Sequence, residues 1–173
     1  MSSSEVIAPA DDGLVDRFKQ AMRRFPSGVT VVTAHPPGPP QAITVSAFCS
    51  VSLDPPLILV CLNRRGRQAG TIANSAAFAV NFLSEDQADD SRACTSPAEN
   101  RLAEVAWRPG SNGAPVLLRA TAALECRRHA LFPAGDHVIL VGEVTDTHLH
   151  ERTRPLAYHD GTYCGVAPRV LAG

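Results

Sequence analysis

A run of small hydroxyl side chains is the first place in the sequence where chemistry could be done. Within residues 44–56, Thr44, Ser46, Phe48, Ser50 and Ser52 occupy alternate positions, so on one extended strand they share a face. Small hydroxyls and free backbone groups can meet a ligand that carries carbonyl, N–H and phosphate groups. Taken alone, the alternation favours a half-exposed antiparallel strand with a polar solvent side. Other residues must decide between the two interpretations.

A basic stretch follows one strand later. Residues 63–71 contain Arg64, Arg65 and Arg67 just before an expected short helix over residues 67–74. Guanidinium groups beside a helix N-terminus form a ready anion site. The alternative is a solvated basic loop.

Two further polar features interrupt apolar runs. Asn81 lies inside the strand-like residues 78–83, where its amide either faces a ligand or satisfies a backbone group. Asp136 and His137 follow Gly135 at the start of another strand-like run, a pattern that alone favours a turn and a hydrogen-bonded histidine. Neighbouring strand residues point to opposite faces, so we expect Asp136 and His137 not to act as one unit.

The elements that must position these residues are mainly strands. Apolar residues at helical spacing predict one amphipathic helix that Asp12 caps and Pro26 ends. No glycine-rich turn joins a strand to a helix, which excludes a dinucleotide-binding doubly wound sheet. Several strands are apolar on both faces, as in a barrel with outer helices or a buried partner surface. Strands are expected over residues 29–34, 42–53, 57–62, 78–83, 120–127 and 137–144, and short helices over 67–74 and 85–94.

Composition narrows the class of protein. The 173 residues carry a formal charge of −1, without the basic excess that nucleic-acid binding requires. The longest apolar run, residues 57–62, is far too short to span a bilayer. Five widely spaced cysteines without a CxxC pair fit free thiols in a reducing, cytoplasmic compartment, and no spaced Cys/His cluster predicts a metal. We expect a tail over residues 1–11 and one domain over residues 12–173.

Several motifs in order resemble one known family. Residues 25–33, 44–56 and 57–63 are similar to its entry motif, flavin strand and next strand. Residues 77–83 and the Gly-Asp-His of residues 135–137 continue the series, and residues 155–158 with 161–163 match its closing pattern. Over residues 14–166 the chain thus resembles the short-chain flavin reductases, which serve two-component monooxygenases. The resemblance implies a mainly β fold, a Greek-key-like, FMN-binding split β-barrel with flanking helices.

The same resemblance implies a function. It implies hydride transfer from NADH or NADPH to FMN or FAD by a homodimer, which supplies reduced flavin to a partner monooxygenase. A flavin-binding module without turnover, and a same-fold oxidase like the pyridoxamine-phosphate oxidases, are the alternatives. His137 is expected beside flavin and nicotinamide, as the one catalytic candidate. The expected cofactor-binding residues are Thr44, Ser46, Ala47, Phe48, Cys49, Ser50, Val51, Ser52, Asn63, Arg64, Arg67, Thr71, Asn81 and Asp136.

One stretch departs from the family pattern. Relatives often carry a serine near Gly66 and a threonine two residues on, where this chain has Gln68. The resemblance therefore does not say which of Arg64, Arg65, Arg67 and Thr71 binds phosphate.

Overall fold

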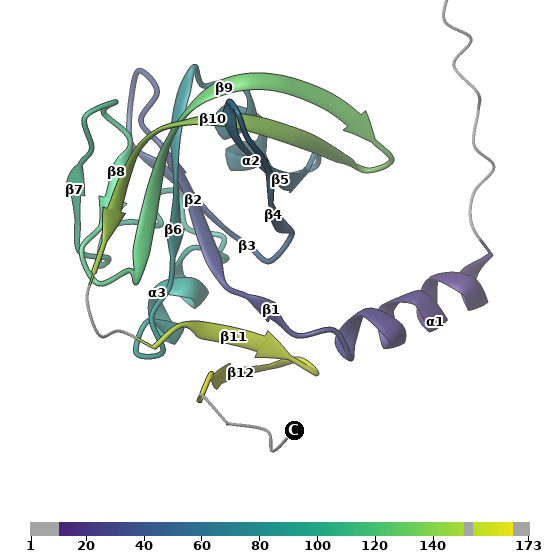
Figure 1. Ribbon diagram of the computed structural model, residues 1–173. Coiled ribbons are helices and arrows are strands. Elements are labelled where there is room, and N and C mark those ends of the chain that lie inside the picture. Colours follow the sequence, from purple (N-terminus) through teal and green to yellow (C-terminus); the bar gives the residue numbers. More distant parts are fainter. Residues whose placement is uncertain (1–10, 151–153, 168–173) are drawn as a thin grey trace, which may run out of the picture.

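A computed structural model describes residues 11–150 and 154–167, and these residues are mainly β (Figure 1). The tail expected over residues 1–11 lies, apart from Asp11, outside them. None of the described helices is long and apolar enough to cross a membrane. In chain order the described elements are α1 (Asp12–Arg23), β1 (Ser27–Gly28), β2 (Thr30–Ala34), β3 (Gln41–Val45), β4 (Phe48–Leu53), β5 (Pro56–Asn63), α2 (Arg67–Asn74), β6 (Ala77–Phe82), α3 (Ala88–Ala93), β7 (Trp107–Pro109), β8 (Pro115–Leu117), β9 (Ala122–Ala134), β10 (His137–Leu149), β11 (Leu156–His159) and β12 (Thr162–Gly165).

The main sheet curls because its two edge strands are neighbours in the chain. Its hydrogen-bonded order over the described residues is β3-β2-β6-β9-β10-β5-β4. In a flat sheet the edges β3 and β4 would lie about 29 Å apart. Only Ser46 and Ala47 join them, and a link of that length spans about 10 Å. The sheet therefore bends until its edges nearly meet, which gives a split barrel (Figure 1).

The crossover corrects one expectation. Residues 42–53 do not form one strand with strict alternation, because the chain leaves β3 at Val45 and enters β4 at Phe48 on the opposite edge. The pairing of β4 with β5 also shifts between Ser50 and Ser52. A bulge of this kind breaks the period of two that the alternation assumed.

The core lies on both faces of the sheet, as the doubly apolar strands predicted. Inside the curl, Val32, Val60 and Phe78 pack with α2. On the outer face, Val31, the neighbour of Val32 on β2, packs with buried residues of segment 83–120. A Cβ on Gly142 would lie 2.4 Å from the Phe78 ring, so only glycine at this position of β10 leaves room for that ring inside the curl.

A long hairpin of β9 and β10 extends beyond the barrel (Figure 1). Both strands continue past the residue ranges that the sequence predicted, since β9 runs to Ala134 and β10 to Leu149. Pairing along the hairpin holds residues of modest strand propensity, such as Pro133, in extended form. Gly135, with φ of +59°, makes the turn.

Helix α1 projects away from the barrel (Figure 1). Its N-cap is Asp11, whose carboxylate accepts a hydrogen bond from the Gly13 N–H, one residue earlier than the expected cap Asp12. Its apolar face is open: the exposed fractions of Leu14 and Phe18 are 53% and 62%.

Candidate functional site

An apolar pocket of about 650 Å³ opens where the two edges of the curled sheet meet. One wall comes from the β3–β4 crossover and from β5, and the other from α1 and the β11–β12 turn. The lining residues are Phe18, Lys19, Met22, Arg23, Phe25, Ser27, Ser46, Ala47, Phe48, Cys49, Leu59, Cys61, Tyr158, Asp160 and Gly161.

Four predicted cofactor residues, Ser46 to Cys49, lie together in this lining. Ser46 and Ala47 form the link from β3 to β4, and Phe48 and Cys49 begin β4 on the opposite edge of the sheet. Strand β4 is an edge strand, so its outer backbone N–H and C=O groups face no further strand of the sheet. The Phe48 ring supports this wall by an edge-on contact with Phe82, with centroids 5.0 Å apart. The wall thus combines small side chains with free backbone groups.

Three other predicted residues of β4 do not reach the pocket. The lining stops at Cys49, and Ser50 and Val51 are exposed beyond it. The Ser52 hydroxyl accepts a hydrogen bond from the Asp54 N–H at 3.2 Å, so it closes the turn toward β5.

The Thr44 hydroxyl has a partner away from the pocket. It donates to the Ser91 carbonyl of α3 at 2.7 Å, and the Ser91 hydroxyl lies 2.8 Å from the Tyr163 hydroxyl. Thr44 therefore ties β3 to α3 and β12.

Asn81 is fully buried, and its amide is used by the backbone. Its Nδ2 donates to the Val31 carbonyl at 3.1 Å, and its Oδ1 accepts from the Leu117 N–H at 2.8 Å. Of the two alternatives left open by the sequence, the structure favours the structural one, because Asn81 joins β2, β6 and β8.

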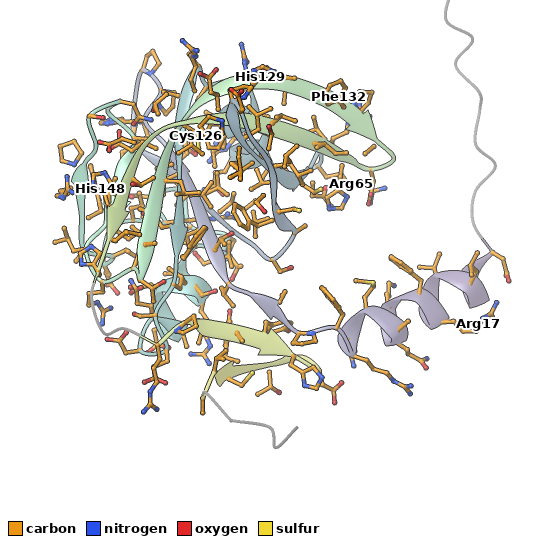
Figure 2. The ribbon with its side chains drawn as sticks, in the orientation of Figure 1. Arg17, Arg65, Cys126, His129, Phe132 and His148 are labelled. Carbon is orange, nitrogen blue, oxygen red and sulfur yellow. The ribbon has the colours of Figure 1, made fainter. Side chains whose placement is uncertain are left out.

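The basic stretch and the Gly-Asp-His turn come together at the far end of β5. His137 pairs with Asn63 across the β5–β10 ladder, and the Arg64 N–H donates to the Asp136 carbonyl at 3.0 Å. The side chains of Arg64 and Arg65 are exposed, and Figure 2 shows Arg65 beside the turn of the hairpin. The Asn63 carboxamide accepts from the Arg65 N–H at 2.9 Å and so shapes the loop.

Asp136 and His137 do act as one unit, which corrects the expectation from strand alternation. His137 Nδ1 lies 2.7 Å from Asp136 Oδ1. Alternation does not apply because Asp136 belongs to the turn and only His137 begins β10. The hydrogen bond from His137 lowers the pKa of Asp136, and the Arg65 charge acts in the same direction. The carboxylate thus places the ring proton on Nδ1 and leaves Nε2 to face other groups.

Helix α2 begins beside this cluster without a side-chain cap. Its N-cap is Gly66, so no side chain accepts hydrogen bonds from its first-turn N–H groups. Two predicted residues on α2 have other partners: Arg67 forms an exposed ion pair with Glu99 at 3.4 Å, and the Thr71 hydroxyl donates to the Arg67 carbonyl. The uncapped helix end and Arg64 and Arg65 are therefore the anion-binding groups left here.

The sequence did not indicate the second wall of the pocket. Phe18 and Met22 lie on the amphipathic helix that the sequence predicted, and neither they nor Tyr158 were among the expected cofactor-binding residues. Tyr158 instead lines the pocket and makes an edge-on contact with Tyr163, with centroids 5.4 Å apart. One feature of the sequence could have indicated this wall: the amphipathic helix leads directly into residues 25–33, the entry motif of the family.

A separate cluster of possible metal ligands lies on another part of the barrel (His148 in Figure 2). It contains Glu125, Asp146 and His148. His148 Nδ1 lies 3.1 Å from an Arg108 Nη, which can only donate, so the ring proton is on Nε2 and points to Glu125 at 2.7 Å. In this arrangement His148 serves as a donor to a buried carboxylate.

Comparison with known proteins identifies the family of the chain. The flavin reductase like domain family matches residues 22–167. The stachydrine N-demethylase reductase subunit of Rhizobium meliloti is 44% identical over 156 residues, which cover 90% of this chain and 66% of that protein. The reductase component of an FADH₂-dependent resorcinol hydroxylase from Rhizobium sp. is 39% identical over 168 residues, which cover 94% of this chain and 93% of that protein.

A solved structure shows the same fold. The NADH:FAD oxidoreductase of Streptomyces globisporus C-1027, in complex with NAD and FAD fragments, has a TM-score of 0.86 at 30% identity. The match covers 95% of this chain and 99% of that chain.

Proposed function

The chain belongs to the flavin reductase like domain family, and we propose that it uses NADH or NADPH to reduce FMN or FAD. The observation that carries the proposal is the layout along β5. Leu59 and Cys61 line the apolar pocket, and Asn63, on the same strand face, begins the basic loop about 7 Å further on. A flavin has this layout: a planar ring system joined by a flexible chain to a phosphate.

The pocket fits the ring system by size and by chemistry. A volume of about 650 Å³ with an apolar lining suits a ligand of this size. Ser46, Ala47 and Cys49 offer small side chains, and the β4 edge offers backbone donors and acceptors for the ring carbonyl and N–H groups. Arg64, Arg65 and the uncapped N-terminus of α2 provide the charge for the phosphate.

The chain's own residues hold and orient the two cofactors. Hydride transfer from nicotinamide C4 to flavin N5 is the chemistry that the bound cofactors supply. Asp136 fixes the His137 tautomer, so Nε2 is the histidine atom that can hydrogen-bond the nicotinamide nucleotide. Phe18, Met22 and Tyr158 give the pocket an apolar wall opposite the β3–β4 crossover. This division of labour requires no nucleophile and no metal.

We also propose that the chain is a homodimer. Helix α1 carries Leu14, Phe18 and Met22 on one side with about half or more of each side chain exposed. Apolar faces of this size on a projecting helix are typical of an interface. A second copy that covers this face would also close the pocket, because Phe18 and Met22 belong to both.

The receiving protein and the compartment follow as further proposals. The relative from Rhizobium sp. is the reductase component of a hydroxylase, and this supports a flavin-dependent monooxygenase as the partner that takes the reduced flavin. All five cysteines are free, which supports a reducing, cytoplasmic compartment.

Steady-state oxidation of NADH, followed at the nicotinamide absorbance band, tests the function. We expect turnover that depends on added FMN or FAD. Replacing Ala47 by tryptophan should fill the pocket and raise the KM for flavin, while replacing the exposed Val51 by tryptophan serves as the matched control. A flavin-binding module would bind flavin without oxidising NADH, and an oxidase would retain its flavin through gel filtration.

A further inference from the structure

A second, polar cavity of about 310 Å³ adjoins the apolar pocket. Its lining comes from the C-terminal end and C-cap of α1 and from the end of β11 with the turn that follows: Gln20, Arg23, Arg24, His159 and Asp160. Arg23 and Asp160 line both cavities. A ligand that extends from the apolar pocket therefore reaches this cavity at once.

The wall of the cavity is positively charged. Within the described residues, the Arg23 and Arg24 guanidinium groups form no ion pair, whereas Arg67, Arg92 and Arg119 each do. Two arginines face a single carboxylate, that of Asp160. Basic residues at a helix C-terminus also interact well with the helix dipole. The helix dipole explains why arginines stand at the C-terminus of α1. It does not explain why they line a cavity between this helix and the β11–β12 hairpin.

The backbone holds the cavity in shape. The Asp160 N–H donates to the Arg23 carbonyl at 2.9 Å and so fixes the hairpin turn against the end of α1. Asp160 and Gly161 have φ of +49° and +80°, as expected for a two-residue turn between paired strands. The backbone positions that carry the charged side chains are therefore fixed before any ligand binds.

The cavity lies on a different side of α1 from the proposed dimer face. At 100° per residue, Gln20, Arg23 and Arg24 point away from the stripe that contains Leu14 and Phe18. A second copy packed on the apolar stripe leaves these arginines open to a ligand.

We propose that Arg23 and Arg24 bind the phosphate groups of the nicotinamide nucleotide while its nicotinamide lies in the apolar pocket. This inference rests on the proposed function. The phosphate of the flavin already has Arg64, Arg65 and the N-terminus of α2, which lie beyond the far end of β5. The pyrophosphate of the second cofactor needs cations of its own, and arginine suits phosphate because it donates two parallel hydrogen bonds. Asp160 offers an acceptor for a ribose hydroxyl.

Charge-removing variants test this assignment. Arg23→Gln and Arg24→Gln should each raise the KM for NADH and the Kd of ADP-ribose about five- to tenfold, as expected for one lost charge-assisted contact. For Arg24→Gln, whose side chain does not line the apolar pocket, the Kd of FMN should change less than about twofold, which is within the usual effect of a distant surface charge. Arg17→Gln is the matched control: it removes the same charge from the same helix but lines neither cavity (Figure 2).

Binding and turnover are read separately, so the two proposals can fail separately. Calorimetric titration of FMN-loaded protein with ADP-ribose needs no hydride transfer, whereas flavin-dependent NADH oxidation by the native chain tests the proposed function. Inorganic pyrophosphate should also compete with NADH on the native chain, an outcome that needs no variant. The assignment is overturned if both variants bind ADP-ribose and NADH as well as Arg17→Gln does, or if they weaken FAD but not NADH.

Discussion

Acid should selectively remove the stability that Glu125 provides. Its side chain is fully buried and accepts four hydrogen bonds, from the Ser111 N–H and hydroxyl, the Asn112 N–H and His148 Nε2. Burial alone would raise the pKa of Glu125, but these bonds outweigh it and lower the pKa to about 2. Relative to the ordinary value of 4.5, this corresponds to about 3 kcal/mol of folding free energy.

The sign follows from the lowered pKa. The contribution of Glu125 is fully present above the unfolded-state pKa of 4.5 and is lost as the pH falls from there through about 2. Glu125→Gln cannot ionise and does not titrate. The difference in unfolding free energy between the native chain and this variant should therefore be about 3 kcal/mol at pH 7 and should shrink steadily below pH 4.5.

Urea denaturation at a series of pH values measures this difference. Glu99→Gln, which removes an exposed carboxylate that is paired with Arg67, is the matched control and should change stability little. If the gap between the native chain and Glu125→Gln stayed constant from pH 7 to pH 3, the hydrogen bonds of Glu125 would not favour its charged form, and the reasoning would be refuted.

Four further predictions follow from the same structure. His137→Ala should raise the KM for NADH, measured at steady state, by a larger factor than it raises the Kd of FMN, measured by titration. A larger factor for FMN than for NADH would exclude a role of His137 in binding the nicotinamide nucleotide. Asn81→Leu should lower the unfolding free energy by about 2 kcal/mol or more, since it leaves buried backbone groups unpaired, with no change in the Kd of FMN for the folded fraction. Gly142→Ala should lower the melting temperature because its Cβ would overlap the Phe78 ring, at a cost of about 1–3 kcal/mol; an unchanged melting curve would contradict this packing. Phe18→Asp should give a monomer in light scattering, and a dimer of native mass would show that α1 is not the interface.

The sequence predicted the fold class and four of the residues that line the pocket. The β-branched runs and the amphipathic helix gave mainly β structure with flanking helices, and the motif around residues 44–56 indicated Ser46 to Cys49. What it could not give was the crossover at Ser46 and Ala47, because the same alternation is compatible with one strand or with two. That difference depends on which strands become the edges of the sheet, and hence on pairing between residues far apart in the chain.

The roles of the individual polar residues also depend on hydrogen-bond partners that lie far away in the sequence. Nothing local says that Asn81 would meet the backbone of β2 and β8, or that the Thr44 hydroxyl would meet Ser91. The Asp136–His137 pair was misjudged because the boundary between turn and strand falls between the two residues, and a shift of one residue changes which face a side chain takes.

Anaerobic mixing of the protein with NADH and oxidised FMN or FAD tests the central claim most directly. The account predicts that flavin absorbance is lost at a rate that depends on the protein concentration, and that the reduced flavin passes through an ultrafiltration membrane that retains the protein. Loss of flavin absorbance no faster than in a protein-free mixture would contradict the proposed reductase. Reduced flavin that stays entirely with the protein would contradict its proposed delivery to a monooxygenase.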